Sequence, residues 1–154
     1  MPADPAGLIY GTILVATLLG AESARSETYP ETIGAVAIAL LLYWLAHSYA
    51  EFAGHRIKHG EHFAYADLAR TAAREVSVLF GAVIPLLVLL IGWAAGAGLD
   101  SAVSAAVWTA AGMIVATEIV IGIRAQLTGR DLVRQTALGA VLGLLVLALR
   151  LLLH

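Results

Sequence analysis

The chain has 154 residues, of which 60% are hydrophobic and only 13% are charged. A soluble domain usually carries about 25% charged residues, so this composition predicts an integral membrane protein whose outer surface is also apolar. The formal net charge of −2 gives no indication of a nucleic-acid partner, and the absence of cysteine excludes disulfides, thiolate metal sites and cysteine nucleophiles.

Five stretches of the chain are long and apolar enough to cross a bilayer core, which takes about 20 residues with a range of roughly 17 to 25. We therefore expect an all-α fold, a single transmembrane bundle over residues 1–154 with spans at 6–22, 31–54, 76–97, 102–123 and 133–153. The first stretch has an alternative interpretation, a signal peptide cleaved within residues 1–25. No Lys or Arg precedes it, whereas signal peptides carry positive charge there, so we interpret it as a span.

The basic residues predict the orientation of these spans. Five spans place the N-terminus and the connections 55–75 and 124–132 on the same side of the membrane. Seven of the nine basic residues belong to that side: Arg56, Lys58, Arg70, Arg74, Arg124, Arg130 and Arg134. The positive-inside rule then predicts a cytoplasmic N-terminus and a C-terminus outside.

The single Lys against eight Arg, with abundant Ala and Gly, suggests a GC-rich bacterial source and thus the bacterial inner membrane.

The 55–75 connection is the only sizeable segment outside the predicted spans. Its sequence "HFAYADLARTAAREV" mixes apolar and charged residues, which is typical of a short interfacial helix. A cytoplasmic extension of the third span is the alternative, and the sequence leaves both open.

Ionisable residues inside the predicted spans provide the main functional hypothesis. His47, Glu51 and His55 are spaced four apart and fall on one face of a helix. With a rise of about 1.5 Å per residue, His47 lies about 6 Å from the midplane of its span, Glu51 about 12 Å and Glu118 about 8 to 9 Å. Charged groups at such depths cost roughly 3 kcal/mol each on insertion scales, so they face the bundle interior, an oligomer interface or a wet cavity. We predict a polar cluster of His47, Glu51 and Glu118, with Thr117 beside it and His55 at its cytoplasmic mouth.

This cluster has three interpretations. The first is a small channel or transporter for protons or cations, because histidine gains and loses a proton near neutral pH and carboxylates can relay it. The second is a divalent transition-metal binding or transport protein, because imidazoles and carboxylates form a suitable ligand set. The metal ligands would be His47, Glu51, His55, His59 and His62. The third is a non-catalytic assembly subunit in which the cluster forms hydrogen bonds between helices.

Other cofactors and enzymatic functions have less support in the sequence. A haem would receive only one deep axial ligand, His47, unless a second copy supplied another. No HExxH motif is present, and the paired Glu-x-x-His helices of carboxylate-bridged metal bundles are absent, so an enzyme ranks last.

Small residues and one proline indicate how the helices pack. Pro85 lies near the middle of its span, where it removes one helical hydrogen bond and leaves the carbonyl of Gly81 free. Glycines recur four residues apart and predict close packing faces, within one chain or between copies: Gly7 with Gly11, Gly92 with Gly96, and Gly139 with Gly143. In the lipid bilayer, we expect a homo-oligomer or a subunit of a larger membrane complex.

The remaining arginines and aromatic residues have simpler explanations. Arg124, Arg130 and Arg134 follow the positive-inside rule, with contact to an anionic lipid or phosphate as the alternative. Arg150, near the end of the last span, can extend its side chain to the headgroups. Trp44 is predicted to pack between helices.

Overall fold

A computed structural model describes residues 4–21, 28–59 and 64–153, and within them all regular secondary structure is α-helical. The helices are α1 (Pro5–Ala21), α2 (Tyr29–His59), α3 (Tyr65–Arg74), α4 (Ser77–Ala94), α5 (Leu99–Arg124) and α6 (Arg130–Leu153). The expected helical bundle is confirmed. Helix α2 continues past the predicted end at residue 54, because nothing in "HRIKH" stops a helix.

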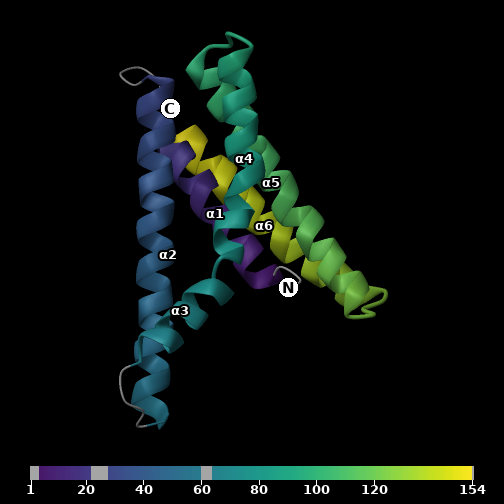
Figure 1. Ribbon diagram of the computed structural model, residues 1–154. Coiled ribbons are helices and arrows are strands. Elements are labelled where there is room, and N and C mark those ends of the chain that lie inside the picture. The colour runs from purple at the N-terminus through teal and green to yellow at the C-terminus, as the bar shows by residue number, and fades with distance from the viewer. Residues whose placement is uncertain (1–3, 22–27, 60–63, 154) are drawn as a thin grey trace.

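Four of these helices are long and apolar enough to cross a membrane: Tyr29–Ile57, Ser77–Ala94, Leu99–Arg124 and Arg130–Leu152. Helix α1 is also apolar but has only 17 residues, the lower limit for a span. A multi-pass membrane protein is thus supported, and the five-span count and the orientation stay predictions. The start of α1 and the end of α6 lie at opposite ends of the bundle (Figure 1).

Helix α1 is the centre of the bundle, because it packs against α2, α4, α5 and α6 (Figure 1). Its buried residues recur at helical spacing and join an alanine-rich face of α5 in the core. The fully buried core residues from these two helices are Val15, Ala16, Leu19, Val103, Ala106, Val107 and Ala110. Small side chains on α5 let the helices approach closely, which in a bilayer supplies the van der Waals contact that holds helices together.

Helices α1 and α4 touch through their backbones. A Cβ atom at Gly11 would lie 1.8 Å from the carbonyl oxygen of Val78, and one at Gly81 would lie 2.2 Å from that of Leu8. A Cβ at Gly7 would lie 2.0 Å from Ser77 Oγ. The packing role predicted for Gly7 and Gly11 is confirmed, since no larger residue fits at this separation.

The other predicted glycine pairs differ from each other. Gly139 and Gly143 pack against α5, at Glu118 and Ala111 respectively. Gly92 packs against Ala102, but Gly96 faces open space and has a φ of +71° in the turn after α4. The backbone amides of Gly96 and the next residue donate hydrogen bonds to carbonyl groups in the last turn of α4. Glycine is therefore needed at position 96 for its backbone conformation and not for packing.

The Gly81 carbonyl group, which Pro85 leaves without a helical hydrogen bond, accepts a hydrogen bond from another helix. Thr12 Oγ1 on α1 lies 2.9 Å from the Gly81 carbonyl oxygen and 2.8 Å from the Leu8 carbonyl oxygen. Thr12 is buried, so its hydroxyl hydrogen is shared between the two carbonyls out of contact with solvent. The proline therefore creates an acceptor that ties α4 to α1.

We expect Thr12→Val to lower the free energy of unfolding by about 1 kcal/mol, because the Gly81 carbonyl then lacks a partner. In a Pro85→Ala background the new amide at position 85 can bond to that carbonyl, so the same change should cost much less. A double-mutant cycle measured by unfolding in detergent micelles tests this. An equal cost in both backgrounds would contradict the assignment.

Gly11→Ala should lower stability by about 1 to 3 kcal/mol, because the added methyl group forces α1 away from α4. The matched control is Gly112→Ala, at a helical position with no atom within 4 Å of the added Cβ. That change should leave stability unchanged or raise it by up to about 1 kcal/mol, as alanine favours the helix. Thermal unfolding in detergent measures both, and similar losses in the two variants would refute the close contact.

Candidate functional site

His47 on α2 pairs with a carboxylate that the sequence analysis did not identify. Its Nε2 atom lies 3.3 Å from Oε2 of Glu75. Glu75 occupies the turn between α3 and α4, where its amide closes α3 by donating to the Thr71 carbonyl. The side chains of His47 and Glu75 are 33% and 24% exposed, so both are mainly enclosed by protein yet remain accessible.

Two tyrosine rings stack with the imidazole of His47. The Tyr43 ring is nearly parallel to it, with centroids 5.8 Å apart and an interplanar angle of 7°. The Tyr10 ring, from α1, lies 6.3 Å away at 28°. Such stacking holds the orientation of the imidazole ring. The spacing of Tyr43 and His47, one helical turn, was visible in the sequence, whereas no local signal indicated Tyr10.

Helix α3 is attached to α2 beside this site. Trp44 Nε1 donates a hydrogen bond to the Ala72 carbonyl oxygen at 3.1 Å, so the predicted packing residue also has a polar role. Helix α3 buries none of its residues fully, and it carries a solvent-accessible Asp67–Arg70 ion pair of 2.8 Å. It is a separate short helix rather than an extension of the third span, and its place at the membrane interface stays a prediction.

Glu118 has a different partner from His47. Gln135 Nε2 on α6 donates to Glu118 Oε2 at 3.0 Å, and the Glu118 side chain packs over Gly139. Helix α1 lies between α2 on one side and the α5–α6 pair on the other (Figure 1). His47 and Glu118 therefore belong to two separate polar pairs, His47–Glu75 and Glu118–Gln135. The sequence predicted that both residues belong to one cluster.

The other predicted pathway residues lie around these pairs. Glu51 is exposed on α2, one turn beyond His47, and Thr117 lines a cleft between the start of α1 and α5. His55 lines a groove of about 460 Å³ between α2 and α3, together with Arg56, Arg70 and Arg74. Their roles in an ion pathway stay predictions.

The predicted metal ligands do not form a metal site within the described part of the chain. Residues 4–21, 28–59 and 64–153 contain no group of three His, Asp or Glu side chains placed to hold a metal ion. His62 lies outside the described residues, as does the side chain of His59.

The predicted lipid-contact arginines are near the α5–α6 turn. Arg124 ends α5, while Arg130 and Arg134 are exposed on the first turns of α6, where Arg134 lies 3.5 Å from Asp131. This surface is accessible, and its contact with lipid or phosphate stays a prediction.

Comparisons with known proteins provide no further assignment. No protein-family model matches the chain, and neither the curated proteins nor the solved structures contain a significant match.

We expect Trp44→Phe to loosen α3 from α2, because it removes the hydrogen bond to Ala72 while keeping an aromatic ring. Loss of one such bond, about 1 kcal/mol, should raise amide hydrogen exchange over 65–74 roughly fivefold. Trp108→Phe is the control, because Trp108 lies on α5 and is 66% exposed. Mass spectrometry of the exchanged protein measures both, and unchanged exchange in Trp44→Phe would contradict this attachment.

Proposed function

We propose that the protein is a small membrane channel or transporter for protons or cations, with His47 and Glu75 as the pair on its pathway. The observation that carries this proposal is the 3.3 Å contact between the two groups, on elements far apart in the sequence. A histidine and a carboxylate attract each other strongly only while the imidazole is protonated and the carboxylate is not. Proton gain or loss at this pair therefore changes the link between α2 and the α3–α4 turn.

The surroundings of the pair suit proton transfer. The rings of Tyr10 and Tyr43 stack with the imidazole, and a phenol can both donate and accept a hydrogen bond. Glu75 is partly accessible, so a proton can reach it from one end of the bundle. The groove with Arg56, Arg70 and Arg74 lies at this end, which supports a cytoplasmic entrance under the positive-inside rule.

Glu118 takes a second place in this proposal. Its hydrogen bond to Gln135 keeps a protonatable carboxylate between α5 and α6 at a similar level of the bundle. It acts either as a separate relay group or as a link between these helices. We place the protein in a multi-pass arrangement in the bacterial inner membrane.

An assembly subunit is the second candidate function. It is favoured by the apolar face that α2 exposes, which includes Ile38, Leu42 and Leu45. A face of this kind fits lipid, a second copy of the chain or another membrane protein equally well. In this alternative the His47–Glu75 pair only holds α2 and α4 together.

Flux measurements in proteoliposomes containing a pH-sensitive dye test the proposal, with a panel of monovalent and divalent cations. We expect Glu75→Gln and His47→Gln to lower proton flux by about a hundredfold, the scale on which a positioned proton-transfer group contributes to a rate. Glu51→Gln is the matched control, an exposed carboxylate one turn from His47 on the same helix. The proton flux of the Glu51→Gln variant should stay within about twofold of that of the wild type, whereas loss of a relay group has a much larger effect.

The other outcomes assign the function differently. Loss of flux in Glu51→Gln or Glu118→Gln, with Glu75→Gln unaffected, would place the pathway on the carboxylates predicted from the sequence. Flux of a divalent cation alone would favour metal transport. No flux from folded wild-type protein would contradict transport and favour the assembly subunit.

A further inference from the structure

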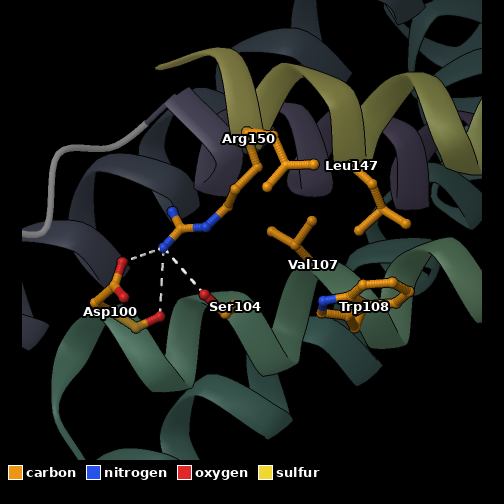
Figure 2. Close-up of a pocket in the computed structure, with 7 residues that line it drawn as sticks. Asp100, Ser104, Val107, Trp108, Leu147 and Arg150 are labelled. Atoms are coloured by element: carbon orange, nitrogen blue, oxygen red, sulfur yellow. Dashed lines mark hydrogen bonds and ion pairs between the residues drawn. The ribbon is translucent and has the colours of Figure 1, made fainter. Parts of the chain in front are cut away.

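A cleft opens at the end of the bundle where α5 begins and α6 ends (Figure 2). Its volume is about 240 Å³, and it has a polar end and an apolar wall. The polar end is formed by Asp100 and Ser104, in the first turns of α5, and by Arg150 near the end of α6. The apolar wall is formed by Val107, Trp108, Leu147 and Leu151.

Arg150 is buried in this cleft with its hydrogen-bonding capacity incompletely used. Its side chain is only 10% exposed and points across the cleft toward α5 (Figure 2). One nitrogen, Nη2, donates to the carboxylate and carbonyl oxygens of Asp100 and to Ser104 Oγ. The other terminal nitrogen, Nη1, is buried and has no hydrogen-bond partner in the described part of the chain. A buried donor without a partner is costly, so this guanidinium is poised to bind an anionic oxygen.

The charges at the polar end fit a ligand that carries both signs. Asp100 balances the charge of Arg150, and its side chain is 70% exposed, so the carboxylate remains available to a cation. A simple anion would be attracted by Arg150 and repelled by Asp100, and a simple cation would meet the reverse. A zwitterion with a phosphate next to an ammonium group satisfies both residues.

The size and the apolar wall of the cleft indicate what is attached to that zwitterion. The volume of the cleft equals that of roughly eight water molecules at about 30 Å³ each. A cleft of this size suits a lipid headgroup and not a peptide helix. Trp108 lies about 12 Å along α5 from Asp100, by the helical rise of about 1.5 Å per residue. Trp108 and Leu151 are 66% and 81% exposed, so an acyl chain can lie along them from the polar end into the bilayer.

We propose that this cleft binds one zwitterionic phospholipid of the phosphatidylethanolamine type. The phosphate binds Arg150 after a small rotation of the guanidinium, the ammonium group binds Asp100, and one acyl chain covers Trp108. This site lies at the end of the bundle opposite to the His47–Glu75 pair and does not depend on the transport proposal (Figure 1).

Native mass spectrometry of the purified, delipidated protein tests the binding, with phosphatidylethanolamine and phosphatidylglycerol titrated separately. We expect one phosphatidylethanolamine per chain, bound at least tenfold more tightly than phosphatidylglycerol, because the attraction of opposite charges about 4 Å apart near a protein surface exceeds a factor of about ten in binding. Asp100→Asn keeps Arg150 and removes the repulsion of anions, so it should reverse the preference toward phosphatidylglycerol. Arg150→Gln should lose the bound lipid, whereas the control Arg70→Gln, which removes an exposed arginine paired with Asp67 on α3, should keep it.

A second measurement locates the lipid and keeps the proposal testable if Arg150→Gln does not fold. Phosphatidylethanolamine with brominated acyl chains should quench Trp108 fluorescence in a Trp44→Phe, Trp93→Phe background, and Asp100→Asn should weaken this quenching. Equal binding of the two lipids in wild type and Asp100→Asn would overturn the proposal. Competition by soluble phosphoethanolamine at the same concentration as the lipid would also overturn it, because the ligand would then be a small soluble zwitterion.

Discussion

The backbone contact between α1 and α4 is the constraint on which the positions of the other groups depend. Gly11 and Gly81 allow the two helices to touch, and the Thr12 hydroxyl adds a hydrogen bond to the carbonyl that Pro85 leaves free. Because α4 begins directly after the turn that contains Glu75, this contact also fixes the carboxylate beside the first half of α1. Tyr10 projects from that same half of α1 to the His47 ring, so one interface determines both the acidic and the aromatic surroundings of the imidazole.

Much of the helical framework could be predicted from the sequence, because helix length, apolar composition and glycine spacing are local properties. The freed carbonyl of Gly81 was also predictable, since proline removes a defined hydrogen bond. The partner of His47 was not. Depth along a span can be estimated from residue number, but the rotation of one helix about another depends on packing between distant segments. Glu118 has a suitable depth and faces Gln135, whereas Glu75 lies outside the predicted spans and meets His47 because α3 folds back on α2.

The two ends of the bundle each contain a basic side chain beside a carboxylate, and the two pairs differ in how many of their hydrogen-bonding groups have partners. His47 contacts one carboxylate and stacks with two aromatic rings. Arg150 keeps its charge at any accessible pH and has more donors than Asp100 and Ser104 use. Under the two proposals, the first pair binds and releases protons and the second holds a lipid.

The position of α2 explains why the His47 site is the place to expect movement. Helices α1, α4, α5 and α6 pack closely on one another, while α2 contributes Val36 and Leu40 to the core but makes fewer contacts with these helices. Near its start, Tyr29 stacks on Trp93 and donates to the Ala97 carbonyl at 2.8 Å; farther along, His47 and Trp44 contact Glu75 and α3. Segments with fewer buried contacts open at lower free energy than the core, and functional motions come from such segments. The His47–Glu75 contact joins α2 to the turn before α4, so under the proposed function a change of protonation acts on the helix with fewer contacts to the core.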